Sequence, residues 1–191
     1  MRKLITGMKT SLDGMVEGPE GVADWVEAWS DDYGLLPHID ACLLGGGMWP
    51  GYEGYWTAIR DHPGTPAWIT GEPPTPAEVE WARFANETPH YVLSTKLTSA
   101  QWPDTSFLRD LDEVAALKRR PGRDIYLVGG ARTAAGLIDA GLVDELRLIV
   151  HPVVAGGGKA LFATARRARG LELRSVEPLD GGRVRLAYGI S

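Results

Sequence analysis

The sequence predicts a single α/β domain, residues 1–191, built on a mixed, mostly parallel sheet. Three observations lead to this prediction. The 191-residue length is usual for one domain, and 44% apolar with 24% charged residues is typical of a globular protein. Short apolar runs alternate with stretches of helical spacing, as strands and helices do in α/β folds. The last two apolar runs flank an Asp-Gly-Gly turn, which is typical of an antiparallel hairpin.

Seven apolar runs are predicted to form the strands. They cover residues 3–8, 41–44, 90–94, 124–128, 145–151, 171–176 and 183–188. The last two strands alternate apolar and polar residues and form the C-terminal hairpin. The hairpin closes one edge of the sheet, so the sheet is expected to be mixed.

Five helices are expected between these strands. They cover residues 23–36, 49–59, 76–84, 112–119 and 132–140. Thr75 precedes Pro76, and Glu78 stands three residues after Thr75, which predicts a capping box at the start of the third helix. This start signal fixes the N-terminus of that helix.

Tryptophans are concentrated around the first two helices. Trp25, Val26, Trp29 and Tyr33 repeat every three or four residues, which predicts one face of the first helix. We expect this face to pack in the core, with a ligand-pocket wall as the alternative. Trp25 and Trp29, together with Trp49 and Trp56, are also candidates for the wall of a pocket that holds a planar ring. Of these four, Trp25, Trp29 and Trp49 are the predicted substrate-pocket residues.

Composition excludes several classes of function. The net charge of -5 argues against a nucleic-acid partner. The single cysteine, Cys42, excludes an internal disulfide and is expected to be buried, and the four histidines lack metal-site spacing, so no metal is predicted. The apolar runs are too short to span a membrane, and the N-terminus lacks the apolar core of a secretory signal. The sequence therefore predicts a cytoplasmic protein with a small-molecule ligand.

Two predicted strands end in glycines and pass at once into helices. One junction is Val128-Gly129-Gly130-Ala131 and the other is Leu44-Gly45-Gly46-Gly47. The first amides of a helix are unpaired and its dipole is positive there, so such a junction can bind phosphate through the backbone. Glycine also serves tight turns for geometric reasons, and for the first junction alone both explanations stand. Two junctions at one sheet edge favour a ligand with several phosphates.

Several motifs occur along the chain in an order that resembles a known protein family. The motifs are Thr10-Ser11-Leu12-Asp13-Gly14, Leu43-Leu44-Gly45, Val92-Leu93-Ser94, Leu127-Val128-Gly129-Gly130 and the run from His151 to Gly158 with Leu161-Phe162. Together they resemble the dihydrofolate-reductase-like family, and within it the C-terminal reductase domain of the bifunctional riboflavin-biosynthesis deaminase/reductase and its stand-alone relatives. The resemblance covers nearly the whole chain. It implies a three-layer fold with an eight-stranded sheet, a homodimer, and hydride transfer from NADPH to a small heterocyclic or ribosylamino-pyrimidine substrate.

The same resemblance implies which residues bind the cofactor. Those expected at the pyrophosphate are Val128, Gly129, Gly130, Ala131, Arg132 and Thr133. Those expected beside the adenosine half are Gly45, Gly46, Gly47, Met48, Ser94, Thr95 and Lys96. Those expected to face the nicotinamide are Gly7, Leu12 and Gly14, in part as a mobile lid.

Two positions depart from the family pattern. Gly46 and Thr95 stand where members of the family commonly place the basic residues that hold the 2′-phosphate of NADPH. A phosphate without a guanidinium loses its strongest charge-assisted partner, although Lys96 or Arg132 can substitute. NADH is therefore an alternative cofactor and a flavin a further one. A non-catalytic nucleotide-binding or flavin-binding protein is the competing hypothesis.

Hydride transfer also requires a proton source, since the cofactor supplies the remaining chemistry. Asp13 is the first choice for this catalytic role because its motif is the one that matches. A loop-capping role for Asp13 is equally supported. Asp24, Glu27, Asp31 and Asp32 compete with it, because related reductases place a carboxylate in the first helix.

Overall fold

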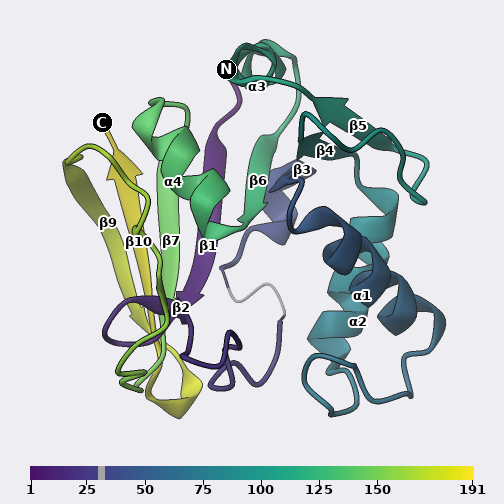
Figure 1. Cartoon of the computed structure of the whole chain (residues 1–191), viewed down its shortest axis with the longest axis vertical. Helices are drawn as coiled ribbons and strands as arrows, with labels where there is room; N and C mark the ends of the chain where they lie inside the picture. The colour runs from purple at the N-terminus through teal and green to yellow at the C-terminus, as the bar shows by residue number, and fades with distance from the viewer. Residues whose placement is uncertain (30–32) are drawn as a thin grey trace.

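The computed structural model describes residues 1–29 and 33–191, and an eight-stranded sheet is its central element (Figure 1). The strands are β1 (Leu4–Thr10), β3 (Ile39–Gly45), β4 (His90–Leu93), β5 (Thr105–Leu108), β6 (Asp124–Gly129), β7 (Glu145–Val150), β9 (Leu171–Pro178) and β10 (Val184–Ile190). Their order is β5-β4-β3-β6-β1-β7-β10-β9. Neighbours from β5 to β7 are parallel, while β10 is antiparallel to both β7 and β9. The predicted mixed sheet with its C-terminal hairpin is confirmed.

Helices cover both faces of the sheet (Figure 1). On one face lie α1 (Trp49–Asp61) and α2 (Pro76–Glu87), and on the other lie α3 (Leu111–Arg119) and α4 (Ala131–Asp139). Successive side chains of a strand point to opposite faces, so Leu4 packs in the core beneath α3 and α4 while Ile5 packs beneath α1 and α2. Because both faces are covered, most residues of the central strands β1, β3 and β6 are buried.

Three short strands escaped the sequence prediction. They are β2 (Met15–Glu17), β5 and β8 (Lys159–Ala160). β2 and β8 form a separate antiparallel pair. β5 contains only two apolar residues, Phe107 and Leu108, after two hydroxyl residues, which is too short an apolar run to be detected from the sequence.

The predicted capping box at α2 is present and also fixes a more distant segment. Thr75 Oγ1 accepts from the Glu78 amide at 3.2 Å, and Glu78 Oε2 accepts from the Thr75 amide at 2.9 Å. Glu78 Oε1 accepts from the Trp29 amide at 2.9 Å. The start of α2 therefore holds the chain near Trp29 in place.

The helix expected over residues 23–36 is wrong for the part of it that the structure describes. Residues 23–29 and 33–35 form turns and loop, a short 3-10 turn covers Leu36–His38, and residues 30–32 lie outside the described chain. Gly34 has a φ of +69°, which a right-handed helix does not contain. Val26 and Tyr33 are nevertheless buried. The three- and four-residue spacing of the apolar residues in this segment therefore reflects their burial and not a helix.

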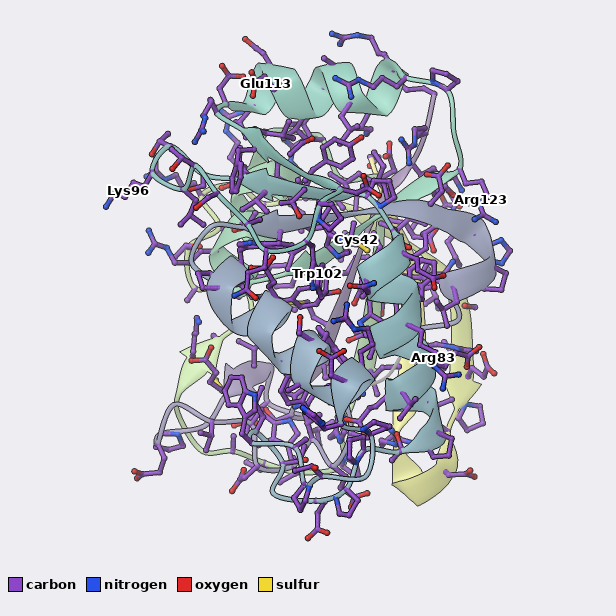
Figure 2. All side chains as sticks on the ribbon, turned by 90° about the vertical axis from the view of Figure 1, so that its right-hand side faces the viewer. Cys42, Arg83, Lys96, Trp102, Glu113 and Arg123 are labelled. Carbon is purple, nitrogen blue, oxygen red and sulfur yellow. The ribbon has the colours of Figure 1, made fainter. Side chains whose placement is uncertain are left out.

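The interior between α1 and the sheet is dense with large side chains. Cys42 and Trp102 lie there, whereas Lys96, Arg83 and Glu113 lie at the periphery (Figure 2). Cys42 is fully buried, as predicted. Among the described residues, no helix combines the length and the apolarity that crossing a bilayer requires.

Candidate functional site

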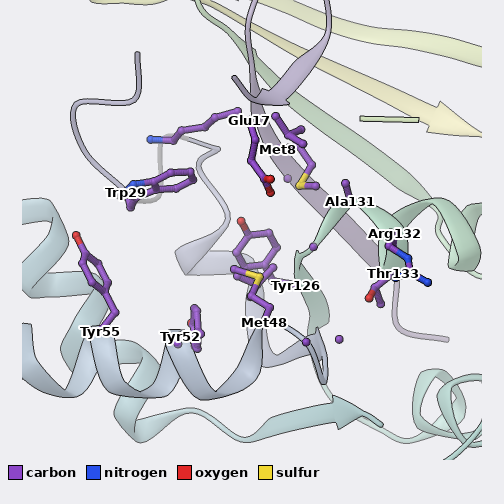
Figure 3. Close-up of a pocket in the computed structure, with 18 of the residues that line it drawn as sticks. Met8, Glu17, Trp29, Met48, Tyr52, Tyr55, Tyr126, Ala131, Arg132 and Thr133 are labelled. Atoms are coloured by element: carbon purple, nitrogen blue, oxygen red, sulfur yellow. The ribbon is translucent and has the colours of Figure 1, made fainter. Parts of the chain in front are cut away.

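A cleft of about 890 Å³ lies over β1, β3 and β6, between α1 and α4. Tyr52 and Tyr55 of α1 line one end, and Arg132 and Thr133 of α4 line the other (Figure 3). Met48 at the start of α1 lies between these ends. The two ends differ in chemistry, since one is aromatic and the other is formed by a helix N-terminus.

The α4 end of the cleft carries unpaired backbone amides. The first helical hydrogen bond of α4 joins the Ala134 amide to the Gly130 carbonyl at 3.0 Å, so the amides of residues 131–133 precede it. Gly129, with a φ of +144°, brings the chain into this turn. This geometry suits an anion such as a phosphate.

The two glycine junctions meet at this end. A Cβ added to Gly45 would overlap the side chain of Thr133, so only glycine at the end of β3 lets α4 approach this closely. A Cβ on Gly129 would lie 3.3 Å from Met48 Sδ, which joins the same two segments. The two junctions therefore lie in contact at one end of the cleft.

A second, shallower hollow of about 490 Å³ adjoins the end of β4. Ser94, Thr95 and Lys96 line it together with Arg109. Arg109 Nη1 donates to the carbonyl oxygens of Ser94 at 2.5 Å and Leu97 at 2.7 Å, and the guanidinium carbon lies 5.6 Å from the Phe107 ring centroid. The hollow thus contains a guanidinium that the sequence analysis missed.

Strand pairing explains how Arg109 reaches this hollow. β5 runs parallel to β4, with Leu108 beside Leu93, so the residue after β5 lies next to the residue after β4. Recognising Thr105–Leu108 as a strand would have identified Arg109 from the sequence.

The remaining expected residues divide into three groups. The main cleft is lined by Gly7, Trp29, Gly45, Gly47, Met48, Trp56, Val128, Gly130, Ala131, Arg132 and Thr133. The second hollow is lined by Gly46, Gly47, Ser94, Thr95 and Lys96. Neither space is lined by Leu12, Asp13, Gly14, Trp25, Trp49 or Gly129.

Two of the expected pocket tryptophans lie elsewhere. Trp49 is only 1% exposed and packs in the core, with its ring centroid 5.6 Å from that of Trp102 and 5.4 Å from that of His90. Trp25 lies beside Gly18, outside the cleft. The expectation that these two form the pocket wall is corrected, because helix α1 directs Tyr52 and Trp56 to the cleft and Trp49 to the sheet.

Asp13 ties two loops together. Its carboxylate accepts from Ser11 Oγ at 2.6 Å and from the amides of Ala155 and Gly156 at 3.0 and 2.9 Å. These bonds, first that from Ser11, lower the pKa of Asp13 to about 2, so it is ionised at neutral pH. This arrangement favours the loop-capping alternative over proton donation.

In the part of the chain that the structure describes, none of the other candidate proton donors lies in the cleft. Asp24 and Glu27 do not line the cleft. Asp31 and Asp32 lie outside the described residues. The proton source therefore remains unassigned among these four.

Other ionisable groups do line the cleft. Lys9 Nζ donates to the Ala28 carbonyl at 2.6 Å. Lys159 Nζ and Glu17 Oε1 pair at 2.6 Å and join β8 to β2. Burial, and secondarily the charge of Glu78, raises the pKa of Tyr55 to about 12, so its hydroxyl stays protonated. Within residues 1–29 and 33–191, no three His, Cys, Asp or Glu side chains gather as metal ligands do.

Comparison with known proteins agrees with this geometry. The family model of the RibD C-terminal domain matches residues 2–184. YyaP, an uncharacterized protein of Bacillus subtilis (strain 168), is 32% identical over 195 residues, which cover 98% of this chain and 94% of that relative.

Two solved structures share the fold. A putative riboflavin biosynthesis protein from Shewanella sp. PV-4 has a TM-score of 0.70 at 17% identity, covering 99% of each chain. The dihydrofolate reductase of Enterococcus faecalis, complexed with NADP(H), has a TM-score of 0.60 at 14% identity, covering 99% of this chain and 96% of that chain. The fold is therefore the dihydrofolate-reductase-like α/β fold.

Proposed function

The chain belongs to the family of the RibD C-terminal domain, a family of NADPH-dependent reductases, and from this premise we propose that it is itself such a reductase. It would transfer hydride from NADPH to a small heterocyclic or ribosylamino-pyrimidine substrate. The observation that carries the proposal is the contact of Gly45 with Thr133 at the unpaired amides of α4. This contact supports phosphate binding at one end of the cleft, and the aromatic end would hold the substrate ring.

The residues present fit NADPH. The amides of residues 131–133 would hold the pyrophosphate, and the glycines at 45–47 would lie along the adenosine half. Lys96 and Arg109 supply the positive charge that Gly46 and Thr95 lack, so the hollow they line suits the 2′-phosphate. When bound, the nicotinamide supplies a hydride. We therefore favour NADPH over NADH.

The chain itself would orient the substrate and exclude water. Tyr33 and Tyr126 line the middle of the cleft beside Gly7, and their ring centroids are 6.0 Å apart. Removal of water strengthens the electrostatic interactions inside such a site. Orientation alone lowers the barrier substantially, because it replaces a bimolecular encounter.

A second candidate function is non-catalytic binding of a nucleotide or a flavin in the same cleft. The observation that favours it is the placement of Asp13, which anchors a loop and, among the described residues, does not line the cleft. A binder needs no proton source, whereas a reductase does.

One titration separates the two candidates. Tryptophan fluorescence is followed as NADPH, NADH or FMN is added, since Trp29 and Trp56 line the cleft. Saturable quenching by NADPH, with weaker binding of NADH and with oxidation of the bound NADPH once a pyrimidine or flavin acceptor is added, supports the reductase. Tight FMN binding without any response to NADPH or NADH would reject it in favour of the binder.

We also propose that the protein forms a homodimer in the cytoplasm. In support, every residue of the edge strand β9 is exposed, including Leu171, Leu173 and Val176. Such apolar side chains on an open sheet edge favour association. Light scattering after size exclusion tests this, with Leu173→Glu expected to give monomer.

A further inference from the structure

We propose that the substrate is a flat, uncharged aromatic or quinonoid ring that carries no phosphate. This inference rests on the proposed reductase function and replaces the heterocyclic substrate considered there with a flat ring that needs no ring nitrogen. It separates this chain from a reductase of phosphorylated ribosylamino-pyrimidines. Four features of the aromatic end of the cleft carry it.

The first feature is a continuous chain of aromatic rings along the cleft. Its members are Trp68, Tyr55, Trp56, Trp81, Tyr126 and Tyr33, all of which line the cleft. Successive ring centroids are 5.5, 4.9, 6.3, 5.7 and 6.0 Å apart. Rings at these distances form a wall that favours stacked or edge-on contact with another flat ring.

The second feature is an exposed tryptophan at the mouth of the cleft. Trp68 is 63% exposed and the adjacent Ile69 is 51% exposed, although both line the cleft. They belong to the loop between α1 and α2, and Trp68 rests edge-on against Tyr55. A flat ligand seated here would cover both side chains, which gives their exposure a function.

The third feature is that the buried cation at this end, Lys9, is already engaged, while Lys159 lies at the border of the cleft in a partly exposed ion pair. Lys9 is 5% exposed and bonded to the Ala28 carbonyl, and Lys159 is paired with Glu17. Arg132 lies at the opposite end, on α4 (Figure 3). A phosphate dianion is held by guanidinium, ammonium or helix-terminal amides, and within the described chain the aromatic wall presents none of these to it.

The fourth feature is the Tyr55 hydroxyl in the aromatic wall. Tyr55 Oη is buried, and the Thr70 hydroxyl is the side-chain group that lies close enough to interact with it by hydrogen bonding. As a neutral hydroxyl, Tyr55 Oη can donate to a carbonyl oxygen of the ring and so fix the ring's orientation.

The corresponding reaction balances with the proposed cofactor. A quinone takes a hydride from C4 of the dihydronicotinamide and a proton from water. The quinone is thereby reduced to the hydroquinone, and NADPH is oxidised to NADP⁺.

The test is calorimetric titration of the protein saturated with NADP⁺, with menadione as the flat uncharged probe and ribose 5-phosphate as the phosphorylated one. We expect menadione to bind and ribose 5-phosphate not to bind. Trp68→Ala should raise the Kd for menadione about tenfold, and Tyr55→Phe should raise it about fivefold. Neither variant should change the Kd for NADP⁺ by more than about twofold. Val22→Ala, an exposed apolar position away from the cleft, is the matched control and should change neither affinity.

The outcomes separate this inference from the function on which it rests. Tighter binding of ribose 5-phosphate than of menadione, with normal NADP⁺ binding, would overturn the substrate class and leave the reductase standing. Menadione affinity that is unchanged in Trp68→Ala would also overturn it. If NADP⁺ and NADPH fail to bind while menadione binds to the cofactor-free protein and depends on Trp68, the ring site stands and the reductase proposal fails.

Discussion

At the scale of single residues, Asp13 links the loop that follows β1 to the loop at residues 153–156. Its pKa of about 2 lies below the ordinary 3.8, so the ionised carboxylate stabilises this link fully above about pH 4. The stabilisation is lost as the pH falls from 3.8 towards about 2. We predict that Asp13→Asn speeds hydrogen exchange of the Ala155 and Gly156 amides several-fold at neutral pH, as measured by NMR.

Turnover distinguishes this anchoring role from proton donation. An anchor predicts that Asp13→Asn keeps a measurable kcat, with an unchanged pH profile and a raised KM for the substrate. A proton donor predicts near-complete loss of kcat. Unchanged amide exchange in the variant would contradict the anchoring role.

Arg109 is the second residue with a specific consequence. In the proposed complex it pairs with the 2′-phosphate, which NADH lacks, and a hydrogen bond to a charged group contributes about 1.5–3 kcal/mol. Arg109→Ala should therefore raise the Kd for NADPH about 10- to 100-fold and leave the Kd for NADH within about twofold. Arg119→Ala, an exposed arginine at the end of α3, is the control. Equal losses for both cofactors would show that Arg109 only supports the loop through Ser94 and Leu97.

At the scale of elements, the contact between β3 and α4 depends on Gly45. A Cβ there would meet Thr133 Oγ1 first and Thr133 Cβ at 3.2 Å. We predict that Gly45→Ala lowers the free energy of unfolding by about 1–3 kcal/mol through overpacking. Thr133→Ala removes the nearest atom, so the double variant should recover part of this loss in urea denaturation. Strictly additive effects would contradict direct contact.

Elements with strong local signals could be predicted from the sequence, and others could not. The long apolar strands and the capped helix α2 were found because their signals are local. The helix expected over residues 23–36 failed because Trp25, Val26 and Trp29 have helical spacing in a segment that tertiary contacts hold as loop, including the Glu78 bond to Trp29. Arg109 was missed because its place depends on the pairing of a four-residue strand.

At the scale of the whole molecule, cofactor binding should stabilise the entire fold, because the cleft joins both helical layers to the sheet. A ligand at 100 times its Kd adds about 2.7 kcal/mol to the free energy of unfolding. For a chain of this size we expect the Tm to rise by about 5–10 °C with NADPH at that concentration, as measured by scanning calorimetry. A Tm that is unchanged in NADPH but raised by FMN would contradict the cofactor assignment.

The candidate site was predictable only in part at this scale. The two glycine junctions could be found from the sequence, because strand ends of one parallel sheet share an edge. The aromatic wall could not, because Tyr55 of α1, Trp68 of the following loop and Tyr126 of β6 converge only through the packing of α1 and α2 on the sheet.

The ion pair between Glu17 and Lys159 gives the protein a sensitivity to ionic strength. The pair joins β2 and β8 at the border of the cleft, and both side chains remain partly exposed, at 38% and 42%. Such exposed pairs contribute little and weaken further as salt screens them. If departure of product limits turnover, added potassium chloride should raise kcat. The Lys159→Gln variant should have the raised kcat without added salt, and its kcat should not change with salt concentration. In the proposed reductase, the salt concentration would then set the residence time of the product.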